Sequence, residues 1–170
     1  MPKAEQSGRL RIGDEWNAIS LLARTQTNPL KALAELVENS LDARAGAVEI
    51  VRGRRAGRLF LSIGDDGEGV PSDAEGRPDF RRVATHVCDS IKRHLEERDG
   101  IHGEFGIGLL GFWSLGEELR LASRGLDSRG WEMVMKRNDP RYRVRPVKGR
   151  ITWQGTEVLI SGLLRATSHV

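Results

Sequence analysis

Three polar side chains recur along one line of a predicted helix near the start of the chain. Glu35, Asn39 and Asp42 are four and three residues apart, so a carboxylate, an amide and a second carboxylate share one helical face. Asn and Asp are poor helix formers that usually occupy caps and turns. Their presence inside a helix indicates a shared ligand, although an ordinary solvated polar face is the alternative.

The helix that positions these groups is predicted to begin at Pro29 and to end near Gly46, a residue suited to a left-handed stop. Its apolar residues follow the i, i+3, i+4, i+7, i+11 spacing of a core-facing stripe. They are Leu30, Leu33, Ala34, Val37 and Leu41.

A second chemical pattern, Asp65-x-Gly67-x-Gly69, follows a predicted buried strand. A carboxylate at this place can accept a hydrogen bond from an exocyclic amine, and the two glycines let a flat ring approach the backbone. The alternative is a common Asp-Gly turn.

A glycine-rich stretch over 103–108 opens directly into an apolar, helix-like segment. Free backbone N–H groups at such a point can bind an anion, whereas the alternative is a flexible hinge. The stretch is not a Walker A loop, because no Gly-Lys-Ser or Gly-Lys-Thr follows, and it lacks the context of a Rossmann fingerprint. Further on, Thr156 begins the last strand with a hydroxyl that can reach a ligand, although Thr is commonplace in strands.

The remaining elements predict an α+β two-layer sandwich, with a mixed, mostly antiparallel sheet covered by helices on one face. A helix capped by Asp14 is expected to run to about Arg24. Later helices are expected over 81–94 and 107–115, and strands over 47–51, 58–63, 118–123, 131–136, 143–153 and 156–161. We expect one domain over 1–170, with 1–13 loosely ordered and 71–105 containing a mobile lid.

Composition narrows the functional classes. The chain has 170 residues, with 27 Lys and Arg against 24 Asp and Glu, a mild excess that suits a small anion better than a dedicated nucleic-acid surface. The single cysteine, Cys88, excludes an internal disulfide and a cysteine-based metal cluster. No apolar run reaches membrane-span length and no signal peptide begins the sequence, so we expect a cytoplasmic protein.

Taken together, the segments 35–43, 65–69, 103–108 and 155–158, in this order and spacing, resemble the GHKL ATPases. This superfamily groups DNA gyrase, heat-shock chaperones, histidine kinases and MutL. The resemblance covers about residues 14 to 162 and implies the Bergerat ATP-binding fold. The helix over 29–46 is most similar to the MutL type, and the glycine-rich stretch to the chaperone type.

The resemblance also implies roles for individual residues. Asn39 would be a ligand of the Mg²⁺ that bridges the ATP phosphates, and Glu35 would orient and deprotonate the attacking water. Asp65 would bind the adenine amine. Further nucleotide-binding residues would be Gly67 and Gly69 at the base, Thr156 through an ordered water, Ser90 and Lys92 in the lid, Gly103, Phe105, Gly106, Ile107 and Gly108 at the phosphates, and Asp42 as a support for these groups.

The function implied is a Mg²⁺-dependent ATPase module, slow in isolation, at the N-terminus of a larger protein that uses ATP-driven closure or dimerisation. Its expected partners are ATP or ADP, a second copy and a following transducer-type domain, which in hydrolysing members supplies a Lys to the γ-phosphate. Nucleic acid would be only an indirect partner, and no membrane is involved. A nucleotide-sensing domain with little turnover and a histidine-kinase-type catalytic domain are alternatives, and Glu35 argues against the kinase.

Overall fold

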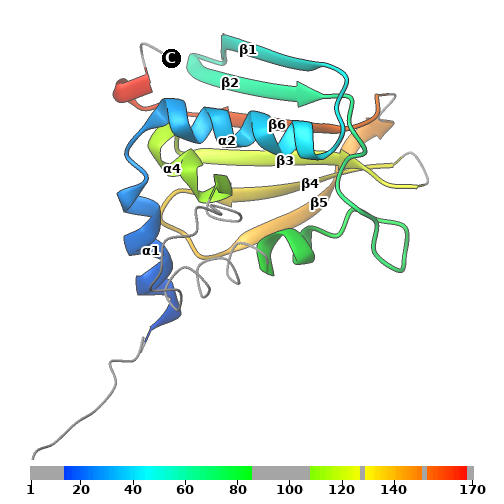
Figure 1. Ribbon diagram of the computed structural model, residues 1–170, viewed down its shortest axis with the longest axis horizontal. Coiled ribbons are helices and arrows are strands. Elements are labelled where there is room, and N and C mark those ends of the chain that lie inside the picture. The colour runs from blue at the N-terminus through cyan, green and yellow to red at the C-terminus, as the bar shows by residue number, and fades with distance from the viewer. Residues whose placement is uncertain (1–13, 86–107, 127–128, 151–152, 168–170) are drawn as a thin grey trace, which may run out of the picture.

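The computed structural model describes residues 14–85, 108–126, 129–150 and 153–167 (Figure 1). Its helices and strands, in chain order, are α1 (Glu15–Thr25), α2 (Pro29–Asp42), β1 (Val48–Arg55), β2 (Arg58–Asp65), the 3₁₀ helix η1 (Gly108–Gly111), α4 (Phe112–Leu115), β3 (Glu118–Arg124), β4 (Arg129–Lys136), β5 (Tyr142–Arg150), β6 (Thr156–Ser161) and the 3₁₀ helix η2 (Arg165–Thr167). A further helix begins at residue 80, and its described part covers 80–85.

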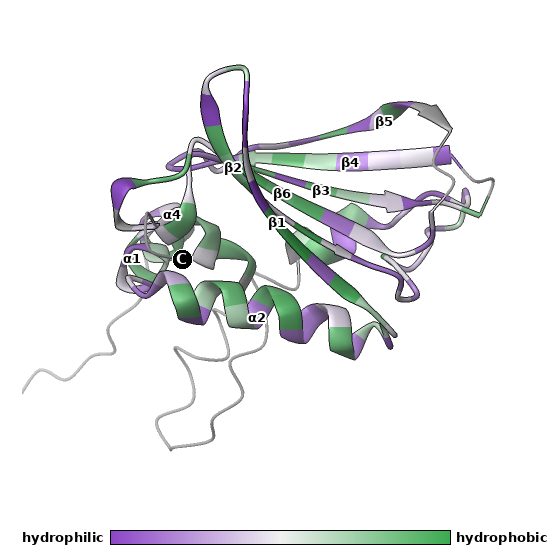
Figure 2. Ribbon diagram, turned by 90° about the horizontal axis from the view of Figure 1, so that it is seen from above, coloured by the Kyte–Doolittle hydropathy of each residue, from purple (hydrophilic) through white to green (hydrophobic). Residues whose placement is uncertain are grey.

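The six strands form one sheet in the order β1-β2-β6-β3-β4-β5, and every pairing between them is antiparallel. Figure 2 shows α1, α2 and α4 on one side of the sheet; no helix of the described chain lies on the other side. The predicted α+β architecture is therefore confirmed. Strands β1 and β2 form a hairpin with its turn at Ala56 and Gly57, whose φ angles are 48° and 78°.

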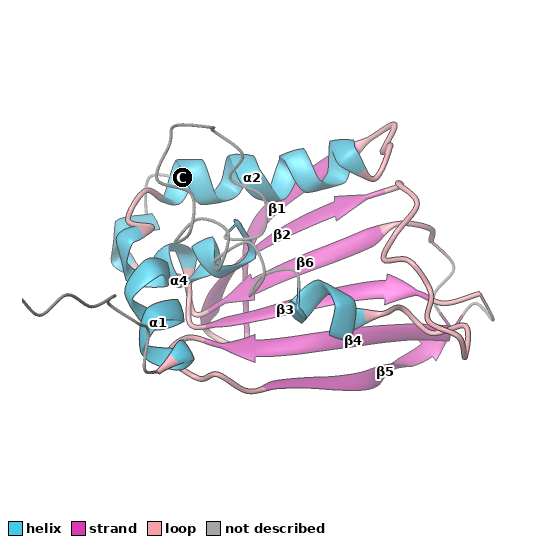
Figure 3. Ribbon diagram, turned by 60° about the horizontal axis from the view of Figure 1, so that its bottom comes forward, coloured by secondary structure: helices cyan, strands magenta, loops and turns pink. Residues whose placement is uncertain are grey.

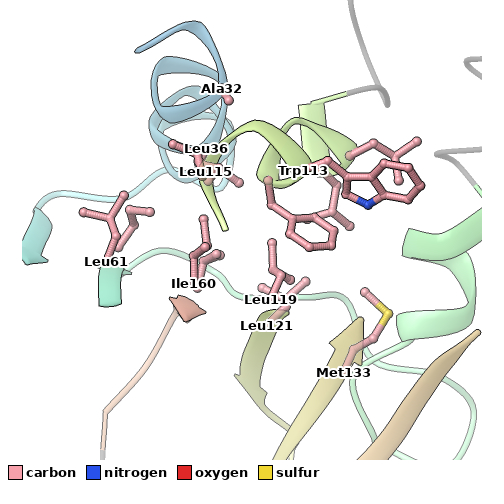
Figure 4. Packing of buried hydrophobic residues seen from close by; sticks show 14 of the residues in the cluster. Ala32, Leu36, Leu61, Trp113, Leu115, Leu119, Leu121, Met133 and Ile160 are labelled. Atoms are coloured by element: carbon pink, nitrogen blue, oxygen red, sulfur yellow. The ribbon is translucent and has the colours of Figure 1, made fainter. Parts of the chain in front are cut away.

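The hydrophobic core lies between the sheet and the helical layer. Figure 4 shows side chains of α2 and α4 meeting those of β2, β6, β3 and β4. Five large residues from different elements, Ile63, Phe112, Leu119, Met133 and Ile160, are at most 1% exposed. Buried and more open residues alternate along the central strands β2 and β6, because successive side chains of a pleated strand point to opposite faces.

Helix α1 begins as predicted. The Asp14 carboxylate accepts hydrogen bonds from the backbone N–H groups of Trp16 and Asn17, which satisfies donors that the first turn of a helix leaves free. Trp16 then packs edge-on against Trp113 of α4, with ring centroids 5.8 Å apart. Figure 3 shows the resulting placement of α1 and α4 at one end of the sheet.

The predicted buried face of α2 is wrong. Leu30 and Leu41 are 62% and 59% exposed, and the buried residues are instead Ala32, Leu36 and Ser40. The reason is close packing: a Cβ at Gly111 of η1 would lie only 3.0 Å from the Ala32 Cβ. The small side chains of this face let α2 approach its neighbours in a way that the leucine face does not allow.

The predicted end of α2 is also wrong. The helix ends at Asp42, and the left-handed residue is Arg44, with φ 59°. The N–H of Gly46 instead donates to the Asp66 carboxylate over 2.7 Å. This contact and a matching one from Ala47 turn the chain towards β1 before Gly46 could act as a helix stop.

Two further predictions concern the helix over 107–115 and the lid over 71–105. The predicted helix over 107–115 is divided into η1 and α4 in its described part. The predicted lid region is described only over 71–85, where Ser72 and Pro78 form a β-bridge and Phe80 is 1% exposed. Phe80 therefore anchors this part of the segment in the core.

Candidate nucleotide site

The Asp65 carboxylate lies at the end of β2, where three chain segments meet. Its Oδ1 accepts hydrogen bonds from the backbone N–H groups of Gly67 at 3.0 Å and Thr156 at 3.1 Å. Its Oδ2 accepts from the hydroxyls of Ser40, at 3.0 Å, and Thr156. Four donors thus fix the orientation of a carboxylate that is only 9% exposed, which is how a protein holds a buried charge in place.

We call this meeting of 65–69, the end of α2 and the start of β6 the glycine junction, because at three of its positions only glycine fits. A Cβ at Gly155 would lie 2.0 Å from the Asp65 carbonyl oxygen, and one at Gly67 would lie 2.6 Å from the Ala43 carbonyl oxygen. Gly69 has φ 76°, and a Cβ there would lie 2.9 Å from Ser123 Oγ. The backbone of 65–69 therefore lies directly against the end of α2 and the start of β6.

Ser123 of β3 braces the same junction from the interior. It is fully buried, its hydroxyl accepts a hydrogen bond from the Val70 N–H at 3.0 Å, and it donates to the Gly155 carbonyl at 3.4 Å. On the surface, Arg44 and Glu68 form an exposed ion pair at 3.0 Å. Such a pair contributes little, so the buried hydroxyl contacts are the more important support.

The polar line of α2 borders the buried face of that helix. Glu35 is half-buried, whereas Asn39 and Asp42 are exposed. Ser40, next to Asn39, is the residue through which α2 contacts Asp65. The structure shows no hydrogen bond from Asp42 to another described residue of the site, so its supporting role stays a prediction.

The structure brings together only some of the predicted site residues. Asp65, Gly67, Gly69 and Thr156 form one cluster, Glu35 and Asn39 lie on the helix that contacts it, and Gly108 begins η1. The other predicted residues, Ser90, Lys92, Gly103, Phe105, Gly106 and Ile107, lie outside the described residues.

Three residues of the junction were not predicted as site residues. Ser40 and Ser123 are small polar residues without a distinctive spacing in the sequence. Gly155 belongs to the segment 155–158, in which only Thr156 was assigned a role. The sequence did contain an indication for Ser40, because a serine inside a helix commonly donates to the i−4 carbonyl or to a partner outside the helix. Its hydroxyl lies 3.4 Å from the Leu36 carbonyl oxygen and 3.0 Å from Asp65.

The neighbouring carboxyl group, Asp66, has a different role. Its pKa is lowered from the ordinary value, first by the hydrogen bond from the Ala47 N–H and also by that from Gly46. Asp66 is exposed and ties β2 to the chain before β1. The two adjacent aspartates therefore have different partners. Asp65 accepts hydrogen bonds from Ser40, Gly67 and Thr156, whereas Asp66 accepts them from the backbone of 46–47.

A divalent cation would find few protein ligands here. Within the described ranges no group of three His, Cys, Asp or Glu side chains is arranged to hold a metal ion. Mg²⁺ bound with a nucleotide usually keeps water and phosphate oxygens and takes only one or two protein oxygens. The exposed amide of Asn39, on the helix that contacts Asp65, fits this limited demand.

Comparison with known proteins supports the geometric argument. The family model "Histidine kinase-, DNA gyrase B-, and HSP90-like ATPase" matches residues 27–148. The DNA mismatch repair protein MutL of Bartonella quintana (strain Toulouse) is 31% identical over 102 residues, which cover 56% of this chain and 14% of that protein. The chain thus matches only a small part of the relative. Where the chain is described, it has no helix long and apolar enough to cross a membrane.

Proposed function

The chain belongs to the family of histidine kinase-, DNA gyrase B- and HSP90-like ATPases, and from this premise we propose that it binds ATP with Mg²⁺ and hydrolyses it. The observation that carries the proposal is the Asp65 carboxylate at the glycine junction, which accepts four hydrogen bonds from the protein. All four lone-pair sites of this carboxylate are occupied, so an amino group would replace one of the two hydroxyl donors, whereas a carbonyl at the same position would be rejected. This chemistry distinguishes adenine from guanine.

The glycine junction supports the proposal in a second way. A Cβ at Gly67 or Gly69 would clash with Ala43 or Ser123, so glycine lets the chain after β2 pack closely enough to hold Asp65 in the position that the proposal gives it. Thr156 donates to Asp65 with both its N–H and its hydroxyl, and the hydroxyl oxygen keeps an acceptor site that can face a ligand or a water.

The polar line of α2 supplies the proposed chemistry. Asn39 would hold Mg²⁺ through its amide oxygen, and the metal would supply charge neutralisation at the phosphates. Glu35 lies one turn earlier on the same helix, and its carboxylate would orient a water and accept its proton as the water attacks the γ-phosphate. The proton moves to Glu35, and the bond to the leaving oxygen of ADP breaks.

The wider role of the cycle follows from the same proposal. We expect closure on ATP to drive pairing with a second copy or docking of a following domain, in a cytoplasmic protein. MutL, the relative named above, is a DNA mismatch repair protein, so a role in DNA repair is consistent with the proposal. Hydrolysis by the isolated chain should be slow, well below the median enzyme rate of about 10 per second.

Calorimetric titration with a non-hydrolysable ATP analogue, with and without Mg²⁺, tests the proposal directly. We expect binding that needs Mg²⁺ and that Asn39→Ala weakens to the level seen without the metal. Glu38→Ala, an exposed change on the same helix, is the matched control and should bind like the parent chain. If the parent chain shows no binding up to millimolar analogue, or if Asn39→Ala and Glu38→Ala bind alike, the proposed site is wrong.

A further inference from the structure

A row of six residues crosses the outer face of the sheet, opposite the helices. The strand registers align Glu49, Gly64, Glu157, Ala122, Glu132 and Arg145, in that order from β1 to β5. Glutamates therefore alternate with the small residues Gly64 and Ala122 until the edge strand β5 supplies an arginine. The row lies on the outer face because neighbouring residues such as Ile63 and Val158 point into the core.

One end of this row already shows which group its carboxylates bind. Arg145 donates from Nε to Glu132 Oε1 over 2.6 Å. A guanidinium group is thus the partner of the third glutamate. Among the described residues, the first two glutamates have no such partner. There, Glu157 accepts a hydrogen bond from the Ser62 hydroxyl, at 3.1 Å, and Glu49 forms no hydrogen bond or ion pair.

A hollow lies over these two glutamates. It has a volume of about 510 Å³ and is lined by Ala47, Val48, Glu49, Val51, Ser62, Gly64, Asp65, Asp66, Trp153, Gln154, Thr156 and Glu157. None of these lining residues is basic. A Cβ placed on Gly64 would meet nothing within 4 Å, so open space stands above the glycine. Adjacent strands are about 4.8 Å apart, which separates the Glu49 and Glu157 backbones by about 10 Å.

Trp153 gives the hollow an aromatic wall. Its side chain is 37% exposed, and the hollow is therefore not merely a group of acids. Asp66 is a further carboxylate of the lining, and its Oδ1 accepts hydrogen bonds from the backbone N–H groups of Gly46 and Ala47. A planar cation suits this lining, since guanidinium stacks on an aromatic ring and forms paired hydrogen bonds with a carboxylate.

We propose that this hollow receives the guanidinium group of an arginine side chain carried by another polypeptide segment. The outer face bears no described helix (Figure 2), so an extended segment can lie along it. A compact ammonium group would stack less well on Trp153 and would contact fewer of the carboxylate oxygens. Asp65 and Thr156 of the proposed nucleotide site also line the hollow. The Asp65 carboxylate, however, is held on the inner face of the strand by Ser40 and Gly67, so the arginine would contact Glu49, Glu157 and Trp153 and not that carboxylate.

Titration followed by amide NMR tests the proposal on the full chain. The probes are Nα-acetyl-arginine amide, the corresponding capped lysine, and the peptide Gly-Gly-Arg-Gly-Gly. We expect saturable shifts at the Gly64 amide and the Trp153 indole, with the latter assigned by its loss in Trp153→Phe. The capped arginine should bind at least threefold more tightly than the capped lysine, and the peptide at least as tightly as the capped arginine.

Two variants identify the groups responsible. The double variant Glu49→Gln and Glu157→Gln should lower the affinity for the capped arginine at least tenfold. Gly64→Val should abolish binding of the capped arginine, because the added side chain fills the open space above residue 64 without a backbone conflict. Glu38→Gln, an exposed acid on α2, is the control and should change nothing. All three should bind the ATP analogue like the parent chain, so a failure here is distinguishable from a failure of the nucleotide site.

Several results would overturn the proposal. These are an absence of saturation by capped arginine up to about 50 mM, shifts that survive Gly64→Val, equal binding of capped lysine, and exclusion of the peptide. The last result would show that the hollow takes a free small cation and no polypeptide.

Discussion

The hydroxyl of Ser40 donates a hydrogen bond to Oδ2 of Asp65 over 3.0 Å, and this contact joins the last turn of α2 to the end of β2. Both residues are buried, at 4% and 9% exposure. The helix that carries Glu35 and Asn39 is therefore positioned, at one point, by the same carboxylate that we assign to adenine. A change at Ser40 should affect both stability and nucleotide recognition.

Ser40→Ala tests this link. Loss of one buried hydrogen bond should lower the free energy of unfolding by about 1 kcal/mol. It should also lower the affinity for an ATP analogue roughly threefold to tenfold. Ser114→Ala is the matched control, because Ser114 is equally buried and donates to the Gly111 carbonyl at 2.8 Å, away from Asp65. Urea unfolding and calorimetry should show a similar stability loss in the control and no loss of affinity. Equal affinity losses in both variants would contradict the proposed link.

Asp65→Asn tests base recognition with the fold retained. The amide oxygen of Asn can still accept from the N–H groups of Gly67 and Thr156, and its NH₂ can donate to the Ser40 and Thr156 hydroxyl oxygens. The acceptor for the adenine amine is lost, so ATP binding should fall by roughly tenfold or more and the preference for ATP over GTP should shrink. Asp66→Asn, which affects only the contacts to 46–47, should keep that preference. An unchanged preference in Asp65→Asn would refute the role of Asp65.

Glu35→Ala separates binding from chemistry. Removal of a general base should reduce ATP turnover by roughly 100-fold or more while binding of the analogue stays within about twofold. Steady-state phosphate release and calorimetry on the same sample provide the two measurements. Glu38→Ala on the exposed side of α2 should affect neither quantity. A parallel loss of binding in Glu35→Ala would show that Glu35 is a ligand and no base.

Gly155→Ala tests the close approach of β6 to Asp65. The new Cβ would lie 2.0 Å from a backbone oxygen, at φ 103°, and we expect a loss of about 3 kcal/mol or more in the free energy of unfolding. Gly57→Ala provides the control for backbone conformation alone: its φ is 78° and a Cβ there meets nothing within 4 Å, so about 1 kcal/mol is expected. Equal losses in urea unfolding would mean that the junction can open at no cost.

Asp139 gives a pH prediction away from the nucleotide site. The side-chain hydrogen bond from Arg141 lowers the Asp139 pKa from 3.8 to about 2, with a further backbone contribution from the same residue. Because the folded-state pKa is below the unfolded value, any stabilisation is fully present above about pH 4 and is lost as the pH falls towards 2. Both side chains are solvent-accessible, so the effect on stability is small. Carboxyl NMR titration should show the Asp139 pKa rising in Arg141→Gln but staying below its ordinary value, because the backbone N–H of residue 141 still donates to the carboxylate; an unchanged pKa would mean that the Arg141 side chain is not the cause.

Much of the fold could be predicted from local patterns. Alternating residues predicted five of the strands to within a few residues of their observed bounds, and Asp14 and Pro29 predicted the starts of α1 and α2, because caps and pleats depend on residues that are neighbours in sequence. The segments that resemble the GHKL family likewise indicated Asp65, Gly67 and Thr156 as one site, and the structure does join these residues.

The sequence by itself determined most of the element types, the family and the polar line of residues on α2, whose chemical roles stay predictions. Only the tertiary structure decided which face of α2 is buried, since both its faces carry apolar residues and the close contact of Ala32 with Gly111 favours one of them. The same holds for Ser40, Ser123 and Gly155, whose partners lie 25 or more residues away in sequence. It holds too for the row from Glu49 to Arg145, which exists only because β6, distant along the chain, pairs in register between β2 and β3. Local propensity acts between sequence neighbours, whereas such contacts depend on how the layers pack.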